Sequence, residues 1–169
     1  MKPLRLLVLL CAFAIPVAAG PTFKSDKSHD YFGYYMPVKA PRTGPWRLRN
    51  LFIAPPADFR SFEAGREPKT YGAVMFEFDD VTSPRKRNEM GQDYYTREAR
   101  VLPATYALNA AGLHFEGKDK ALGRIVFDGT FAKGFFKKKG TDTQEPLLHG
   151  TLTVGKRSFA VDFTWFGGD

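Results

Sequence analysis

The chain has 169 residues, in which 25 lysines and arginines outnumber 18 aspartates and glutamates, and its formal net charge is +7 at pH 7. Aromatic residues make up 15% of the chain, which supplies enough apolar surface for a large core in a single domain. The only cysteine is Cys11, so a chain processed beyond that position has no thiol nucleophile, thiolate metal site or redox-active cysteine.

Residues 1–19 have the three-part pattern of a secretory signal peptide. Two basic residues come first, an apolar run covers residues 6–15, and small residues follow it. The run is too short to span a bilayer, which takes about 20 apolar residues. A lipid anchor at Cys11 is disfavoured because Leu10 stands where a small residue is expected. We therefore expect export, with cleavage before Gly20.

Cleavage of 19 of the 169 residues leaves 150, and the net charge falls from +7 to +5 because two basic residues are lost. A small exported domain without cysteine must be held together by its core, and such domains fit the Gram-negative periplasm. A basic surface attracts anionic neighbours such as lipopolysaccharide, phospholipid head groups and acidic polymers. Nucleic acid suits the charge but not the compartment, so we expect no nucleic-acid partner and no transmembrane segment in the mature chain.

Residues 20–45 are polar, aromatic and interrupted by three prolines near their end, which exclude a helix there. We expect an extended N-terminal arm over 20–45 and a single β domain over 46–169. The aromatic residues of the arm indicate that it packs on another surface, and residues 23–36 are a candidate docking segment for a protein partner.

Period-two alternation of apolar residues predicts strands after the arm, with one short helix between Pro56 and Gly65. In the first predicted hairpin, a loop at residues 109–112 has Asn to open the turn and Gly to close it. This loop sets Leu108 opposite Leu113. The other expected strands cover residues 46–53, 70–78, 94–102 and 122–132.

A second hairpin is predicted around a two-residue type II′ turn at residues 155–156, which sets Val154 opposite Arg157. Gly129 and Gly150 fall at matched inward positions, and glycine inside a strand is typical of a strong bend or close packing. About seven antiparallel strands with one short helix indicate an all-β fold, either a small curled barrel or a sandwich. The bend signals favour the barrel.

The overall pattern of an apparent signal peptide, aromatic-rich antiparallel strands and a C-terminal hairpin ending in "DFTWFGGD" resembles the calycin-like small periplasmic barrels in architecture. This resemblance implies a fold and no particular activity.

The best carboxylate cluster in the sequence comprises Glu77 and Asp79 on one outward strand face and Asp80 at the strand end. Three oxygen donors suit calcium, but the spacing is not that of an EF-hand loop. We favour the interpretation that these carboxylates form a charged, solvent-facing strand surface. The three histidines lack ligand spacing, so we expect no metal and no cofactor.

No nucleophile motif, phosphate loop or dinucleotide fingerprint is present. His149 opposite Asp162 forms the base and orienting carboxylate of a miniature triad, with Thr151 and Ser158 on the same face as candidate third members. Surface His–Asp pairs are far more common than triads. We therefore favour a non-enzymatic protein and keep a hydrolase using His149 and Asp162 as an alternative.

Two loop segments combine basic and aromatic residues, a combination suited to stacking on sugars or to a lipid interface. The usual role of such charge is simply to solvate a loop. If Phe135 and Phe136 are buried, the neighbouring lysines solvate the loop. If both are exposed, an anionic, lipid-like surface is the leading partner. The candidate binding residues are Arg85, Arg87, Tyr94, Tyr95, Phe135, Phe136, Lys137, Lys138 and Lys139.

These observations favour an exported, non-enzymatic β-barrel domain that binds an apolar or amphiphilic ligand, or an anionic envelope surface. The motivation is the high phenylalanine content combined with a basic rim. The main alternative is a protein-interaction module, either an inhibitor of a hydrolase or an envelope assembly factor, that docks through residues 23–36.

Overall fold

The computed structural model describes residues 22–141 and 143–168, so the expected signal peptide and Cys11 lie outside the described residues. Thirteen strands and two helices form in the described part of the chain. The strands are β1 (Phe23–Ser25), β2 (Gly33–Pro37), β3 (Arg42–Thr43), β4 (Trp46–Ile53), β5 (Val74–Asp80), β6 (Arg85–Arg87), β7 (Asp93–Tyr95), β8 (Glu98–Val101), β9 (Pro103–Asn109), β10 (Gly112–Asp119), β11 (Gly123–Phe131), β12 (Leu148–Val154) and β13 (Arg157–Phe166), and the helices are α1 (Pro56–Glu63) and α2 (Phe135–Lys138).

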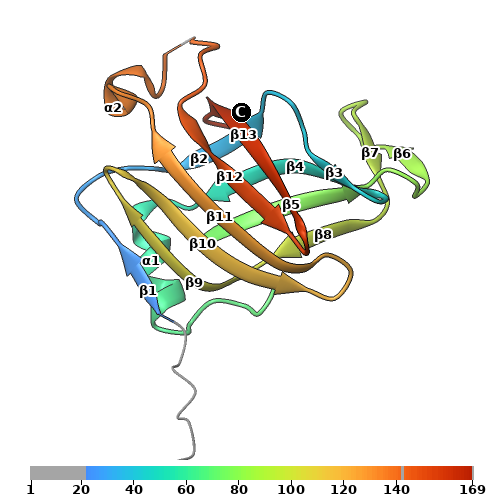
Figure 1. Cartoon of the computed structure of the whole chain (residues 1–169), viewed down its shortest axis with the longest axis horizontal. Coiled ribbons are helices and arrows are strands. Elements are labelled where there is room, and N and C mark those ends of the chain that lie inside the picture. The colour runs from blue at the N-terminus through green and yellow to red at the C-terminus, as the bar shows by residue number, and fades with distance from the viewer. Residues whose placement is uncertain (1–21, 142, 169) are drawn as a thin grey trace, which may run out of the picture.

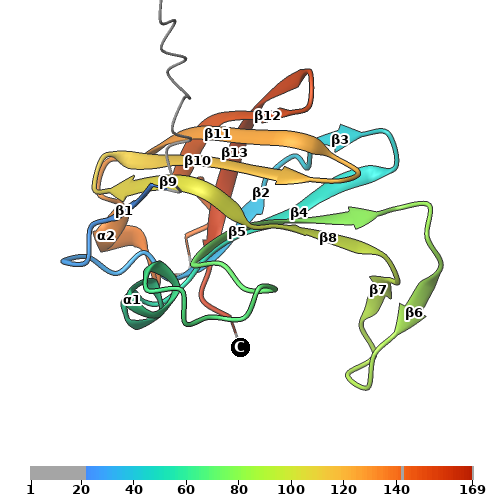
Figure 2. The same ribbon diagram turned by 90° about the horizontal axis from the view of Figure 1, so that it is seen from below.

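Eleven of the strands form one sheet in the order β1-β9-β10-β11-β12-β13-β2-β4-β5-β8, with β3 beside β4. All of its pairings are antiparallel except that between β1 and β9. The sheet curls into a half-barrel, so that β9 to β12 lie across β4, β5 and β8 (Figures 1 and 2). β6 and β7 pair only with each other and project from one end (Figure 1).

The all-β class is confirmed, whereas the prediction of about seven strands is wrong. β1, β3, β6 and β7 have only two or three residues each, too few for alternation to reveal them. The single strand expected over 94–102 is divided into β7 and β8. The chain turns between them, where the Thr96 N–H donates to the Pro84 carbonyl and the Arg97 carbonyl accepts from Asp80.

The segment expected to be a separate arm contributes three strands to the same sheet. β2 lies between β13 and β4, with Tyr35 paired to both Trp165 and Leu51. Tyr31 and Tyr35 are buried because their rings pack into the common core. Residues 22–45 therefore belong structurally to the β domain.

Both hairpins have the predicted register. Leu108 pairs with Leu113, and Val154 pairs with Arg157. Gly155 has a φ of 60°, the positive value that the first central residue of a type II′ turn requires. The second central residue, Lys156, does not have a positive φ, which distinguishes this turn from type I′. The predicted helix is also confirmed as α1, which begins at Pro56 and ends before Gly65.

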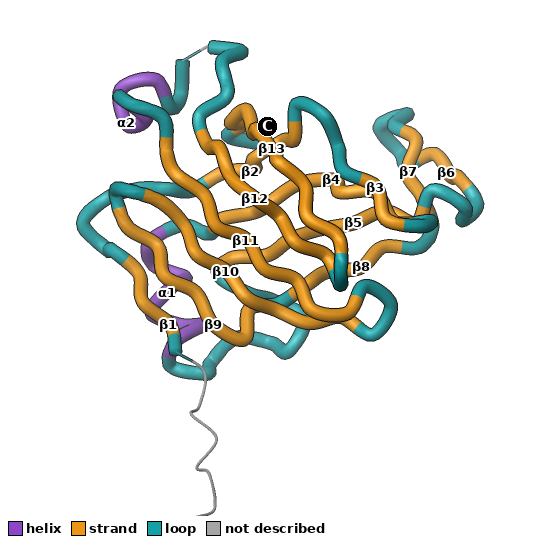
Figure 3. The backbone as a smooth tube through the Cα atoms, in the orientation of Figure 1, coloured by secondary structure: helices purple, strands orange, loops and turns teal. Residues whose placement is uncertain are grey.

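Both helices lie on the side of the molecule away from β6 and β7 (Figure 3). Phe59 and Phe62 of α1 pack on Tyr106, at ring-centroid distances of 5.7 Å and 6.3 Å. The helix therefore covers the end of the sheet near β1 and β9. Of the helices in the described residues, neither is long and apolar enough to cross a membrane.

Aromatic side chains fill the space inside the curl. Phe76 of β5 contacts Phe115 and Phe127, at centroid distances of 5.0 Å and 5.4 Å, and Phe127 meets Phe163 edge-on at 5.7 Å. All four rings are fully buried. These contacts join the β10–β13 side of the half-barrel to β5 through a packed interior.

Gly129 and Gly150 make room for the ring of Phe127. They pair with each other across β11 and β12. A Cβ atom on Gly129 would lie 2.4 Å from Cε1 and Cζ of Phe127, and one on Gly150 would lie 2.7 Å from the same ring. The two glycines that the sequence marks as a bend or close packing are thus places of close packing.

We predict that Gly129→Ala destabilises the protein by about 2–3 kcal/mol, because the methyl group overpacks against Phe127. Adding Phe127→Leu removes the clash, so the double variant should cost at least about 1 kcal/mol less than the two single changes together. Urea unfolding of the four proteins measures this coupling. Strict additivity would contradict the assigned contact.

Glu63, at the end of α1, holds β1 against the sheet. Its carboxylate accepts hydrogen bonds from Ser25 and Lys27, both at 2.8 Å, and from the Tyr106 hydroxyl at 2.9 Å. Burial raises the pKa of Glu63, but the hydrogen bonds from Lys27, Ser25 and Tyr106 outweigh burial and hold that pKa below its usual range. The ionised carboxylate therefore stabilises the fold.

A lowered folded-state pKa gives stability that is fully present above the ordinary Glu pKa of about 4.3 and is lost as the pH falls through the folded-state value. We predict that Glu63→Gln unfolds about 1 kcal/mol more easily at pH 7, and that this difference shrinks as the pH falls below about 4. Urea titrations across this pH range measure the effect. Glu89→Gln, at an exposed position, serves as the control, and a deficit that stays constant with pH would contradict the role of the charge.

Candidate functional site

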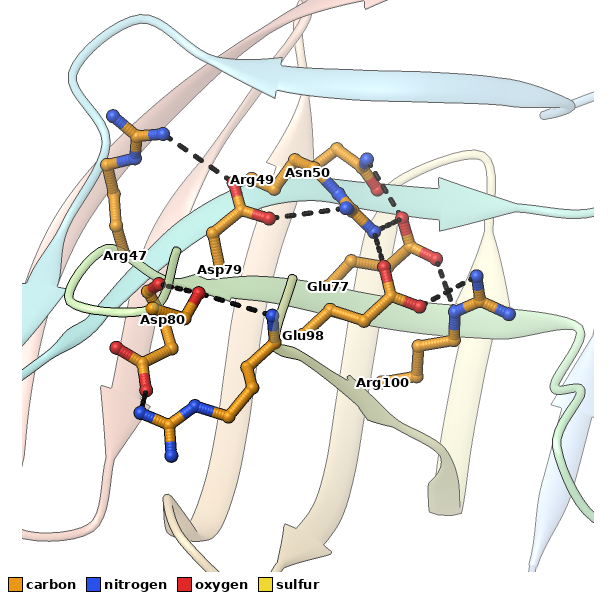
Figure 4. A network of polar contacts seen from close by, with 10 residues as sticks. Arg47, Arg49, Asn50, Glu77, Asp79, Asp80, Glu98 and Arg100 are labelled. Carbon is orange, nitrogen blue, oxygen red and sulfur yellow. Dashed lines mark hydrogen bonds and ion pairs between the residues drawn. The ribbon is translucent and has the colours of Figure 1, made fainter. Parts of the chain in front are cut away.

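The acidic cluster of β5 is buried, which corrects the expectation of a solvent-facing surface. Glu77 is 8% exposed, Asp79 6% and Asp80 2%. Arginines from the neighbouring strands β4 and β8 cover these carboxylates (Figure 4). The alternation in β5 therefore predicts correctly that these carboxylates lie on the outer face of the sheet. It does not predict that arginines of other strands cover them.

Arg49 stands at the centre of this network. Its guanidinium lies 2.9 Å from Glu77, 3.2 Å from Asp79 and 2.9 Å from Glu98. The pairing of β4 with β5 shifts register between Leu48 and Asn50, so Arg49 stands at a bulge. This bulge lets one side chain of β4 reach carboxylates on both β5 and β8 (Figure 4).

Further arginines surround the central one. Arg100 lies 2.9 Å from Glu98 and 3.4 Å from Glu77, Arg47 lies 3.5 Å from Asp79, and Arg97 lies 2.6 Å from Asp80. The four guanidinium groups thus balance four carboxylates. In the described part of the chain, no group of three or more His, Cys, Asp or Glu side chains is arranged to hold a metal ion. The network is structural, and it does not support the calcium interpretation.

We predict that Arg49→Met destabilises the protein by about 2–3 kcal/mol, because Glu77 and Asp79 lose a main counter-charge while buried. Arg47 and Arg100 remain nearby and limit the loss. Urea unfolding measures the effect. Arg124→Met is the matched control because its partner Glu116 is solvent-accessible, and we expect it to cost less than about 0.5 kcal/mol. Equal costs for the two variants would show that the buried network adds no net stability.

The β6–β7 hairpin forms a pocket beside this network. Arg85 pairs with Tyr95 across the hairpin, and the ring of Tyr95 has Arg47 at 5.4 Å and Arg85 at 5.7 Å from its centroid. The pocket encloses about 270 Å³. Its lining residues are Arg47, Arg49, Asp79, Arg85, Asp93, Tyr94 and Tyr95.

The lining contains three guanidinium groups and two carboxylates, but Arg47 and Arg49 belong to the balanced network, so the excess positive charge is on the hairpin side. Asp93 is shared, since it lies 3.1 Å from Arg85 and 3.0 Å from Arg87, which stands just outside the lining. Tyr94 is a large, exposed side chain at the rim. The site therefore offers guanidinium N–H donors beside aromatic faces, which suits an anionic group.

The structure brings together three of the predicted binding residues, Arg85, Tyr94 and Tyr95, and places Arg87 beside them. Sequence reasoning missed Arg47 and Arg49, which come from a strand about forty residues earlier. Alternation in "WRLRN" places both Arg47 and Arg49 on the outward side of β4, and this signal could have identified them. The sequence does not show that β4 lies beside the β6–β7 hairpin.

The second predicted segment forms the short helix α2 at the opposite end of the sheet from β6 and β7 (Figures 1 and 2). Phe135 is 2% exposed and packs on Phe131, whereas Phe136 is 39% exposed and stacks on His29 at 4.5 Å. The sequence predicted that both phenylalanines would be buried or both exposed, and the structure shows one of each. The structure does not bring this segment together with the arginine pocket.

The lysines of α2 are largely engaged with carboxylates. Lys138 pairs with Glu145, and Lys139 pairs with Asp30 at 2.9 Å while lying 5.4 Å from the Trp165 ring. Lys137 is exposed. These contacts fasten the α2 region to the loop between β1 and β2 and to the loop that follows α2, which weakens the case for an anion site there.

The predicted His149–Asp162 pair is present on the outer face, with 2.8 Å between Nδ1 and the carboxylate. The Ser158 hydroxyl bonds to Thr153 instead of to His149. A second exposed pair, His114 with Asp128 at 2.6 Å, was not predicted. Among the hydrogen bonds of the described residues, none joins either histidine of these pairs to a hydroxyl nucleophile, so the geometry does not support the hydrolase alternative.

Comparison with protein-family models, with curated proteins and with solved structures finds no match to this chain.

Proposed function

We propose that the protein is an exported, non-enzymatic β domain that binds anionic, phosphate-bearing head groups at the surface of the cell envelope. The periplasm is the proposed compartment. The observation that carries the proposal is the pocket at the base of the β6–β7 hairpin, which Arg47, Arg49 and Arg85 line and in which Arg47 and Arg85 lie over the ring of Tyr95.

The excess positive charge at the arginine pocket comes from the β6–β7 hairpin. Arg47, Arg49, Arg97 and Arg100 belong to a set in which guanidinium and carboxylate groups are equal in number. At the hairpin, Arg85 and Arg87 share the single carboxylate of Asp93, and the Lys86 side chain adds a further exposed charge. An anion that reaches this point meets an excess of positive charge in a partly enclosed space.

The packed interior supports a surface-binding function over the apolar-ligand version of the hypothesis. Phe76, Phe115 and Phe127 contact one another across the interior and are fully buried. An apolar ligand would have to displace these rings. A phosphate group at the hairpin requires no such rearrangement, because the guanidinium N–H groups there already border a pocket.

We predict that the protein co-sediments with vesicles of phosphatidylethanolamine and phosphatidylglycerol and does not co-sediment with vesicles of phosphatidylcholine. The double change Arg85→Gln and Arg87→Gln should weaken binding about tenfold or more, because each cation near an anionic surface contributes about 1 kcal/mol. Competition by inorganic phosphate tests whether the phosphate alone is recognised.

The matched control is Arg60→Gln with Arg66→Gln, which removes the same charge from exposed positions in and after α1. This control should bind within about twofold of the original protein. Equal weakening in both double variants would mean that net charge alone drives binding, and the pocket would then have no specific role.

A second candidate function is that of a protein-interaction module, because β13 pairs with β12 from Arg157 to Phe163 but with β2 only from Phe163 to Phe166, which leaves part of its edge open. Residues 23–36, the docking segment expected from the sequence, contribute β1 and part of β2 to the sheet, and Tyr31 and Tyr35 of this region are buried. A protein partner is therefore better accommodated at β13.

A further inference from the structure

β13 has a neighbour on both sides along only part of its length. It pairs with β12 from Arg157 to Phe163 but with β2 only from Phe163 to Phe166. One further bond, from the Val38 N–H to the Asp162 carbonyl at 2.8 Å, closes this second pairing. Beyond it the chain leaves β13 toward β3, so residues 157–161 have a strand on one side only.

The hydrogen-bonding parity of the hairpin shows which main-chain groups face this open side. In an antiparallel pair joined by a two-residue turn, the residues flanking the turn bond to each other and the pattern then alternates. Arg157, Phe159 and Val161 therefore bond toward β12. Ser158 and Ala160 direct their N–H and C=O groups away from it. Asp162 belongs to the same alternate set, because its carbonyl faces away from β12 and accepts the hydrogen bond from the Val38 N–H.

A groove of about 400 Å³ runs along this open edge. One wall is the β2–β3 connection and the other is β13, where Phe159 is partly buried and Ala160 is exposed. The groove is mostly apolar apart from two cations. Its lining residues are Lys39, Ala40, Pro41, Arg42, Phe159 and Ala160.

The cations at this edge have no carboxylate partners within the described residues, which sets them apart from most arginines of the protein. No ion pair involves Lys39, Arg42 or, at the hairpin tip, Lys156 and Arg157, whereas seven other arginines each have one. A second copy of the chain would bring the same positive groups to the edge and be repelled. An occupant with carboxylates is complementary.

We propose that the open edge of β13 binds an extended acidic peptide segment of a partner protein, which adds a strand beside Ser158 and Ala160. The main-chain groups of these two residues bond the peptide backbone, and the groove over Phe159 receives an apolar side chain. Lys39 and Arg42 face its carboxylates. A segment of about five residues spans the open stretch, since strands extend about 3.3 Å per residue. This site is separate from the arginine pocket and does not depend on it.

The test uses a fluorescent, end-capped peptide of alternating aspartate and valine with the full mature chain. We expect fluorescence anisotropy to detect binding, and NMR to show slower amide exchange at Ser158 and Ala160 in its presence. A lysine–valine peptide should not bind. The aspartate–valine peptide with alternate backbone nitrogens methylated should bind at least about tenfold more weakly, because it cannot complete the strand ladder.

Two variants probe the two components of the site. Ala160→Pro removes an N–H that faces away from β12, so it blocks strand addition at a position where an edge tolerates proline. Lys39→Glu with Arg42→Glu reverses the charge without changing β13. Each should weaken peptide binding about tenfold or more, while Arg60→Glu with Arg66→Glu should not. Circular dichroism and the Tm of each variant verify folding.

Four outcomes would overturn the proposal. The first is equal binding of the methylated and unmethylated peptides, which would reveal charge attraction alone. The second is an effect of the peptide on amides of the β6–β7 hairpin in place of Ser158 and Ala160. The third is absence of peptide binding at millimolar concentration. The fourth is a dimer, detected by sedimentation and abolished by Ala160→Pro, which would make a second copy the occupant.

Discussion

The contact between Phe127 and two facing glycines is the constraint on which the curl of this sheet depends. An inward side chain at Gly129 or Gly150 would occupy the place of the Phe127 ring. With that place free, the ring reaches Phe76 on the far side of the curl and Phe163 beside it. The half-barrel is thus held by aromatic packing across its interior and has no need of a disulfide.

A filled interior moves any binding function to the outer surface and the edges. On the outer face of β4, β5 and β8, carboxylates and arginines neutralise each other around Arg49, which is a stabilising arrangement with no excess charge. Positive charge is in excess at two places outside this balance. One such place is the β6–β7 hairpin, where two arginines share Asp93, and another is the edge of β13 near Arg42.

The open edge follows from the position of β2 in the curled sheet. β2 must pair with β13 on one side and with β4 on the other, and it has only five residues with which to do so. Its bonds to β13 end with the one that the Val38 N–H donates, because the chain then leaves β13 toward β3. The remaining length of β13 therefore keeps main-chain groups without a strand partner, next to unpaired cations.

Local chemistry in the sequence determined the all-β class, helix α1 and the register of both hairpins, because turn residues and alternation act over a few positions. Only the tertiary structure decided what covers each face. Alternation put Glu77 outward but could not show that Arg49, from another strand and at a bulge, buries it. Likewise, Phe135 and Phe136 are adjacent in the sequence, and only the packing of Phe135 against the distant Tyr31 and Tyr35 shows that it is buried while Phe136 is exposed.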